Sequence, residues 1–317
     1  MTEELHGWRR YAVVFLGMLL TAALCALAIP FSMNPRGAAG PTALQAESAV
    51  PVVSAIIVCF GLATGIAGYV GRLINGAVGL FVLGVGLSVL AWRWETIEEL
   101  AFSEGSLGLV GLETALWAGI LFAATVGVLK MAGPLTDMVP DDPDSGTVGD
   151  GWGGLGLRGV AAGILVLPVV WLVARSELKG QVLAAVVLGS MLVGLCGRFL
   201  SPYSQPRLLV AAPCLFGALG HVIGMVLLKQ PLVEAYVTQS IPALSLPMPI
   251  DYAAGSLLGV SMGLGWAKSF QQQEQEQEPE PGNDTARPAD DRSVLGFLVV
   301  GTVLFIGLRV LGSFLGG

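Results

Sequence analysis

Asp251 combines a titratable side chain with a spacing pattern that predicts its surroundings. It is followed by Gly255, Gly259 and Gly263 at steps of four residues, and residues four apart share one face of a helix. Small residues at this spacing let membrane helices pack closely, so we expect the carboxylate to point into a helix bundle. Ionisable groups in such places often mark a path for ions or substrates. The alternative is that Asp251 only caps the start of its helix.

Glu113 is the second carboxylate that the sequence places within an apolar run. An unpaired carboxylate there costs a few kcal/mol, so Glu113 is expected to face protein or water. It precedes Lys130 by the same interval that separates Asp251 from Lys268. Two carboxylates at the outer mouth of a central cavity would suit the binding of cations or of a proton-coupled substrate. The alternative is again a residue that starts a helix.

Three basic side chains complete the set of candidates. His221 lies in an apolar run, where a histidine transfers protons or binds a metal. The other histidine, His6, is in the N-terminal tail, so a structural hydrogen bond to a neighbouring helix is favoured. Arg72 and Arg198 each follow a Gly-x-x-Gly pattern at a predicted helix end. Anchoring on the positively charged inner side explains both; the alternative is an inner gate paired with the acidic residues at 141–144.

Other chemistry is poorly represented. There is no His-Glu-x-x-His pattern, no phosphate-binding loop and no basic patch for nucleic acid. Ser190 and His221 are a nucleophile and a base, but nothing around them favours an intramembrane protease. The cysteines lie singly in apolar runs, which is typical of small buried hydrophobic residues. The sequence therefore predicts no enzyme, no cofactor and no metal or disulfide site at Cys25, Cys59, Cys196 and Cys214.

The elements that must position these residues are membrane helices. Hydrophobic residues make up 54% of the 317 positions and charged residues 12%, against roughly 25% charged in a soluble domain. Such a chain needs lipid as the solvent for its outer face. The fold class is therefore an all-α, polytopic transmembrane bundle. A span needs about 20 apolar residues, which predicts about nine spans, at 11–31, 51–71, 75–92, 108–129, 156–174, 181–200, 208–228, 249–267 and 294–314.

The distribution of positive charge predicts the orientation. With the N-terminus inside, more of the 16 lysines and arginines fall in inner than in outer segments. We therefore expect a multi-pass protein of the cell (inner) membrane with a cytoplasmic N-terminus and an external C-terminus. The apolar run at 11–31 is interpreted as a retained first helix rather than a cleaved signal. Two outer segments, 92–105 and 230–249, are predicted to be interfacial linkers, with lids or re-entrant elements as the alternative.

An internal repeat is the predicted domain organisation. Leu62-Ala63-Thr64 precedes Gly68 and Gly71-Arg72, and Leu188-Gly189-Ser190 precedes Gly194 and Gly197-Arg198 at the same intervals. Four-helix units begin and end on one side of the membrane, so the repeat would be parallel. The alternative is that helices of standard length space their charges alike by chance. The expected parts are a first unit at 1–135, an acidic loop at 136–155, a second unit at 156–268, a disordered linker at 269–293 and a C-terminal helix at 294–317.

Two functions fit these predictions. The helix count, the paired acids and the repeat slightly favour a transporter of a small solute or ion. The alternative is a scaffold or accessory subunit of a membrane complex, since few polar residues lie at mid-membrane depth. Besides lipid, the expected partner is a second copy or another membrane protein that packs on Gly255, Gly259 and Gly263. A water-filled cavity that reaches Glu113 and Asp251 would distinguish transport from a dry scaffold.

Overall fold

The computed structural model describes residues 7–33, 40–135, 138, 157–202 and 205–276. Residues 1–267 form one compact unit and residues 268–317 a second; of the second, the description covers only the end of the last helix. Each regular element within these ranges is helical. The elements are α1 (Gly7–Ala26), α2 (Ile29–Ser32), α3 (Ala49–Leu73), α4 (Gly76–Arg93), α5 (Ile97–Phe102), α6 (Leu107–Ala132), α7 (Leu157–Val160), η3 (Ala161–Leu165), α8 (Val166–Val173), α9 (Lys179–Leu200), α10 (Arg207–Leu227), α11 (Leu232–Val237), η4 (Ala243–Ser245) and α12 (Pro249–Glu276).

Six helical segments in the described ranges are long and apolar enough to cross a membrane. They coincide within a few residues with six of the predicted spans, and they fit a multi-pass membrane protein. The first combines α1 and α2, with Pro30 in the first turn of α2, where its missing N–H leaves no helix bond unmade. The six segments are Trp8–Ser32, Ala49–Leu73, Gly76–Arg93, Leu107–Ala132, Lys179–Leu200 and Arg207–Leu227.

The span expected at 156–174 is not one continuous α-helix. The chain runs through α7, the 3₁₀ segment η3 and α8. Pro168 explains the interruption, because it lacks an N–H and its ring clashes with the carbonyl four residues earlier, that of Ile164 in η3. Gly163, also in η3, lets the chain approach Phe216 of α10 closely. Of this region, only Ala161–Val173 is an apolar helical stretch, and it is shorter than the six spans.

The last predicted spans have different outcomes. The one expected at 249–267 is helical but belongs to α12, which continues to Glu276 and is not among the six apolar segments. The linker expected from 269 therefore begins as helix, which suits its glutamines and glutamates, since both are good helix formers. The span expected at 294–314 lies outside the described residues. The count of nine is thus not confirmed.

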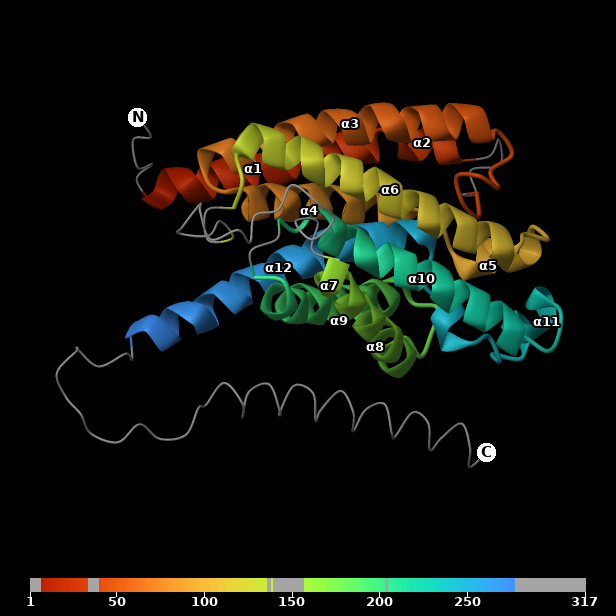
Figure 1. Cartoon of the computed structure of the whole chain (residues 1–317). Helices are drawn as coiled ribbons and strands as arrows, with labels where there is room; N and C mark the ends of the chain where they lie inside the picture. Colours follow the sequence, from red (N-terminus) through yellow and green to blue (C-terminus); the bar gives the residue numbers. More distant parts are fainter. Residues whose placement is uncertain (1–6, 34–39, 136–137, 139–156, 203–204, 277–317) are drawn as a thin grey trace, which may run out of the picture. The chain divides into compact units, whose positions relative to one another are not determined.

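α4 lies at the centre of the first unit (Figure 1). It contacts α1, α3, α6 and α9, and its glycines allow these approaches. A Cβ added at Gly86 would lie 2.8 Å from the Cβ of Thr21 in α1, and one at Gly84 would lie 2.9 Å from the Cβ of Leu257 in α12. The Thr21 hydroxyl also donates a hydrogen bond of 3.0 Å to the carbonyl of Val82. Helices without bulky side chains at a crossing pack closely in this way.

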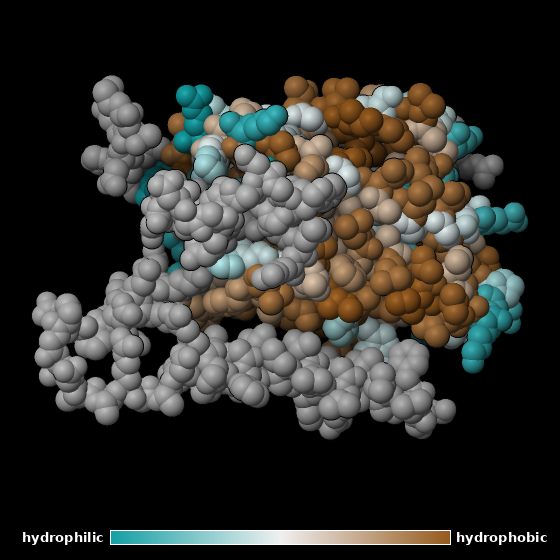
Figure 2. Space-filling model, in the orientation of Figure 1, coloured by the Kyte–Doolittle hydropathy of each residue, from teal (hydrophilic) through white to brown (hydrophobic). Residues whose placement is uncertain are grey.

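The face of this unit that Figure 2 shows is largely apolar and drawn in brown. α1 and α3 bury the smallest share of their lengths among the six spans. Tyr11 and Phe15 of α1 and Ile57 and Leu62 of α3 are all more than half exposed. Water would make such a surface costly, whereas lipid is the solvent that it fits. The coarse prediction of a membrane bundle is therefore supported from both composition and surface.

The internal repeat is not supported. The opening helix of the first proposed unit, α1, is continuous, whereas its counterpart is broken at η3. The acidic loop expected at 136–155 lies outside the described residues, except Met138. The orientation of the termini and the identity of the membrane also stay predictions.

Candidate functional site

Asp251 forms an ion pair at the start of α12. It is fully buried, and each of its carboxylate oxygens lies 2.9 Å from the Nζ atom of Lys179. One of them also accepts a 2.9 Å hydrogen bond from the N–H of Met248. Lys179 is the first residue of α9, and its side chain keeps an exposed fraction of 14%. The pair therefore joins the starts of α9 and α12, and the carboxylate also caps its own helix.

Glu113 is held differently. It is 3% exposed in the second turn of α6. One carboxylate oxygen accepts the N–H of Ala43 at 3.1 Å and the other accepts the N–H of Leu44 at 3.0 Å. Both amides belong to the loop between α2 and α3. Glu113 thus satisfies two buried backbone donors, which would otherwise cost free energy comparable to lost hydrogen bonds.

Glu95 is the third buried carboxylate. It lies between α4 and α5 with no exposed surface, and its φ of 57° is in the left-handed region. Such a conformation costs a non-glycine residue of the order of 1 kcal/mol or more. One oxygen, Oε2, accepts the N–H of Ile250 at 2.9 Å. The other, Oε1, has no hydrogen-bond partner among the described residues.

These groups form one electrostatic unit, which we call the acid cluster: Glu95, Glu113, Lys179 and Asp251. Burial raises the pKa of Glu95 well above its ordinary value of 4.5, and the nearby Glu113 and Asp251 carboxylates raise it further. The hydrogen bond from Ile250 and the charge of Lys179 act in the opposite direction. Folding therefore shifts the equilibrium of Glu95 towards the neutral acid, relative to an ordinary glutamate.

His221 belongs to a separate group of polar side chains beside the acid cluster. It is 1% exposed, and its ring meets that of Tyr252 edge to face at 5.8 Å. Gly111 of α6 packs on His221. Glu113 is two residues further along α6, and residues two apart in a helix face different directions. His221 and the Glu113 side chain therefore lie on different sides of α6. Within the described ranges, no hydrogen-bond partner is found for either ring nitrogen of His221, the Tyr252 hydroxyl, the Ser245 hydroxyl or Trp94 Nε1.

The two arginines do not form an equivalent pair. Arg72, in the last turn of α3, is exposed, whereas Arg198, in the last turn of α9, is 3% exposed. A parallel repeat would place them in like surroundings. The acidic residues at 141–144, the expected partners of an inner gate, lie outside the described residues. Gating by either arginine stays a prediction.

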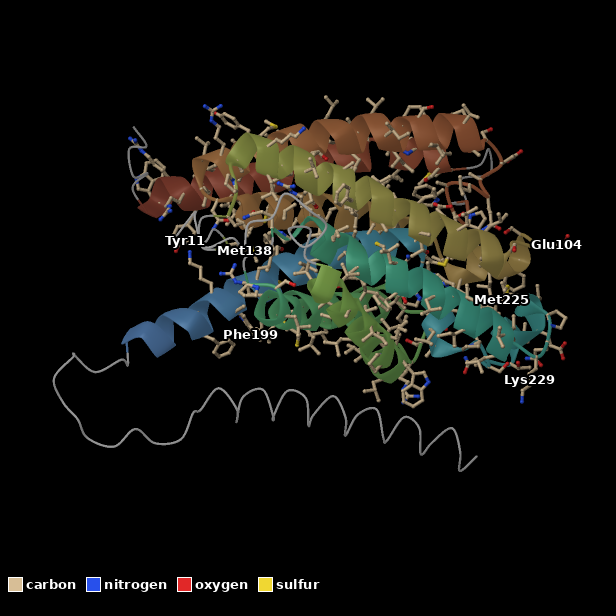
Figure 3. The ribbon with its side chains drawn as sticks, in the orientation of Figure 1. Tyr11, Glu104, Met138, Phe199, Met225 and Lys229 are labelled. Atoms are coloured by element: carbon tan, nitrogen blue, oxygen red, sulfur yellow. The ribbon has the colours of Figure 1, made fainter. Side chains whose placement is uncertain are left out.

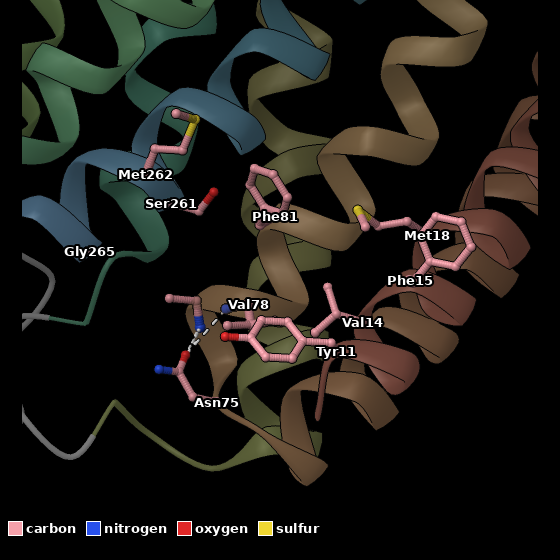
Figure 4. Close-up of a pocket in the computed structure, with 11 residues that line it drawn as sticks. Tyr11, Val14, Phe15, Met18, Asn75, Val78, Phe81, Ser261, Met262 and Gly265 are labelled. Atoms are coloured by element: carbon pink, nitrogen blue, oxygen red, sulfur yellow. Dashed lines mark hydrogen bonds between the residues drawn. The ribbon is translucent and has the colours of Figure 1, made fainter. Parts of the chain in front are cut away.

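A cavity of about 540 Å³ opens between α1, α4 and α12 (Figure 4). Tyr11, Asn75 and Ser261 contribute polar atoms, and most of the lining is apolar. Asn75 is also the N-cap of α4, since its side-chain oxygen accepts two backbone N–H groups. The cavity therefore lies where α4 begins, whereas Glu95 lies two residues beyond the end of α4.

The cavity and the acid cluster lie at opposite ends of the unit formed by residues 1–267. Figure 3 shows Tyr11 and Met138 near one end and Glu104, Met225 and Lys229 near the other. The 18 residues of α4 separate the ends by about 27 Å. The cavity does not reach the buried Glu113 and Asp251, so it is not the water-filled mouth that the sequence predicts.

Ser261 lies at the centre of a Gly-x-Ser-x-Gly sequence, from Gly259 to Gly263. In serine hydrolases this pattern forms a strained turn between a strand and a helix. Here it lies within α12, and the Ser261 hydroxyl donates to the carbonyls of Leu257 and Leu258. Ser261 also follows Tyr252, the contact of His221, by nine residues or about 14 Å of helix. The pattern is therefore part of a packed helix and does not form a nucleophile elbow.

The glycine stripe of α12 is covered by α9 of the same chain. A Cβ added at Gly255 would lie 2.6 Å from a methyl group of Val186. Added Cβ atoms at Gly259 and Gly263 would meet backbone atoms of Val187 and Met191. The close packing expected of these glycines is present, but it is internal. This corrects the prediction that they are a surface for a second copy or a partner protein.

Sequence reasoning selected two of the four members of the acid cluster. Glu95 lies within 92–105, the segment predicted to be an interfacial linker, and Lys179 is one of the positive charges that fall in outer segments. The sequence does not show which residues pair in the fold, because 72 residues separate Lys179 from Asp251 and 155 separate Glu95 from Ile250. The left-handed conformation of Glu95 has no signal in the sequence.

No family model, no curated protein and no solved structure matches this chain. Function is therefore inferred from the chemistry of the site, since a fold alone does not specify it.

Proposed function

We propose that this chain is a permease for a small solute or ion, and that the acid cluster is its ion-binding site. The observation that carries the proposal is the burial of Glu95 together with two further buried carboxylates, Glu113 and Asp251, and the nearby charge of Lys179. Buried ionisable groups are costly in a membrane protein and commonly mark ion or substrate paths. The polar side chains of His221, Ser245 and Tyr252, which lie beside the cluster, are suited to contact a polar solute.

In a permease the buried cluster must open to water during the transport cycle, because an ion has to reach it. Alternating access achieves this by moving helices around a fixed site. The ion pair between Lys179 and Asp251 joins α9 to α12 and is the contact that such a movement would change. The described conformation then corresponds to a closed state.

The second candidate is a non-catalytic scaffold or accessory subunit. The observation that favours it is the burial of Glu113 and Asp251, at 3% and 0% exposure. In a scaffold these side chains only fasten helices together, and the cluster never opens.

Thiol accessibility distinguishes the two functions. The four native cysteines are replaced, and cysteine is then introduced by Ser245→Cys or by Ser190→Cys. Both serines are fully buried, and serine and cysteine are similar in size. Ser245 lies in η4, three residues before Met248, whose N–H donates to Asp251. Ser190 lies under Gly259 in the packed contact of α9 with α12, which makes it the matched control. A membrane-impermeant thiol reagent is added to each side of sealed proteoliposomes.

For a permease, we expect the Ser245→Cys chain to react from at least one side and the Ser190→Cys chain to stay unreacted. Absence of reaction at both positions, in proteins that unfold at the parent's temperature, overturns the permease proposal and supports the scaffold. Equal reaction at both positions also overturns it, because it reports general loosening instead of opening at the cluster.

A further inference from the structure

The carboxylate oxygens of the acid cluster are almost all engaged. Both oxygens of Glu113 accept backbone N–H groups. Both oxygens of Asp251 accept the ammonium group of Lys179, and one also accepts a backbone N–H. Oε2 of Glu95 accepts the N–H of Ile250. Oε1 of Glu95 is the cluster oxygen for which the described residues offer no partner.

One unengaged oxygen limits the class of ion that the cluster can take. Ca²⁺ needs about six to eight oxygen ligands, and Mg²⁺ needs a near-ideal octahedron. The described part of the chain contains no group of three or more His, Cys, Asp or Glu side chains arranged for a metal. A proton needs a single oxygen. A buried carboxylate that lacks a partner avoids the cost of a bare charge by taking up a proton.

We propose that Glu95 binds one proton at Oε1 and that this proton is the ion linked to opening of the acid cluster. The inference rests on the proposed permease function and names its coupling ion. The charged groups around Glu95 are Glu113 from α6, Lys179 from α9 and Asp251 from α12. With Glu95 neutral, two carboxylates and one ammonium leave a formal charge of −1; with Glu95 ionised, the formal charge is −2.

Loss of the proton therefore adds repulsion between Glu95 and the carboxylates of Glu113 in α6 and Asp251 in α12. Glu95 is also joined to α12 through Ile250, the residue before Asp251. The protonated cluster holds the start of α12 against Glu95 and the segment that follows α4, and the ionised cluster favours their separation, because Glu95 and Asp251 then repel each other. Proton release and opening are linked for this reason, and no further ion is required.

Infrared spectroscopy of the purified full-length chain in lipid nanodiscs tests the proton directly. A protonated carboxyl group buried away from water has a C=O stretching band distinct from that of carboxylate. The wild type is compared with Glu95→Gln, which mimics the neutral acid, and with Glu98→Gln, an exposed control three residues away. Glu95→Asp retains an acid at the position and serves where the glutamine variant folds poorly.

We expect a carboxyl band near neutral pH in the wild type and in Glu98→Gln, lost in Glu95→Gln and shifted in Glu95→Asp. The band should decline as pH is raised. A band that persists in Glu95→Gln and stays unshifted in Glu95→Asp, or a wild type without a band, overturns the assignment.

The link to opening has its own measurement. The rate of thiol labelling of Ser245→Cys is taken in the wild-type and Glu95→Gln backgrounds, and their ratio is followed with pH. A ratio that rises as the carboxyl band declines supports the link, and a ratio independent of pH overturns it. If Ser245→Cys never reacts while the band behaves as expected, the proton site stands and the permease function fails. If Ser245→Cys reacts and the band is absent, the permease stands without this proton.

Discussion

Replacement of Lys179 by methionine should destabilise the chain strongly. The change leaves Asp251 fully buried and removes two of its three hydrogen bonds, so that only the one from the N–H of Met248 remains. Removal of one member of a buried ion pair typically costs about 3–5 kcal/mol, because the other charge stays uncompensated. Methionine keeps most of the length of the lysine stem, so the loss of packing is small.

The converse change, Asp251→Asn, should cost less. The lysine side chain is 14% exposed, so its ammonium group can turn towards water when the carboxylate is removed. Asparagine also retains an oxygen for the N–H of Met248. We expect a loss of about 1–2 kcal/mol, the cost of charged hydrogen bonds without a stranded buried charge. The double variant should lie well below the sum of the two losses, since the residues are in contact.

Equilibrium unfolding in mixed micelles, followed by tryptophan fluorescence, measures these differences. Lys229→Met is the matched control, because Lys229 is exposed and surface changes usually stay within about 0.5 kcal/mol. The reasoning is refuted if Lys179→Met is no more harmful than Lys229→Met, or if Asp251→Asn is the more harmful change. The first result would mean that Asp251 is not held by the lysine, and the second that the lysine is the stranded charge.

Three further predictions concern the pH dependence of stability, the glycines of α12 and the cap of α4. Because the pKa of Glu95 is raised in the folded state, the unfolded chain loses this proton first as pH rises, and the free energy of unfolding should fall by about 1.4 kcal/mol per pH unit above about pH 4.5 until the folded pKa is passed. A Glu95→Gln chain should lack this component of the slope in pH-dependent unfolding curves. Gly259→Ala places a methyl group against backbone of α9 and should cost about 1–3 kcal/mol in unfolding free energy. Gly265→Ala, on the same helix, meets no atom within 4 Å and should be neutral or slightly stabilising; equal losses would contradict the packing described. Asn75→Ala removes two cap hydrogen bonds from α4 and should lower the same quantity by about 1 kcal/mol, and an unchanged value would show that the cap contributes nothing.

The long apolar runs were sufficient to predict six spans, because length and composition alone decide whether a helix can cross lipid. The same criterion failed near Pro168, where a local backbone defect interrupts the helix. It also misjudged the end of α12, whose helical continuation depends on glutamine and glutamate propensity and not on hydropathy.

The candidate site could be predicted only in part. Glu113 and Asp251 were noticeable because a charge in an apolar run is rare. Whether such a charge is open to water or sealed by backbone amides depends on loops that pack against it, as Ala43 and Leu44 do against Glu113. Those contacts join distant parts of the chain, and no periodicity in a single sequence records them. The partner surface was misassigned for a related reason, since a glycine stripe does not specify whether its neighbour is internal.

The sequence separations within the acid cluster also set an order of events during biosynthesis. Chains emerge from the ribosome N-terminus first. The amides of Ala43 and Leu44 are therefore made before their acceptor, Glu113, which follows them by 70 and 69 residues. The intervals are longer for Glu95, whose donor is Ile250, and for Lys179, whose partner is Asp251. A nascent chain that stops short of α12 therefore lacks both the backbone donor of Glu95 and the carboxylate partner of Lys179. Quality-control machinery that detects exposed charge would have in this cluster a marker that disappears only when synthesis reaches α12.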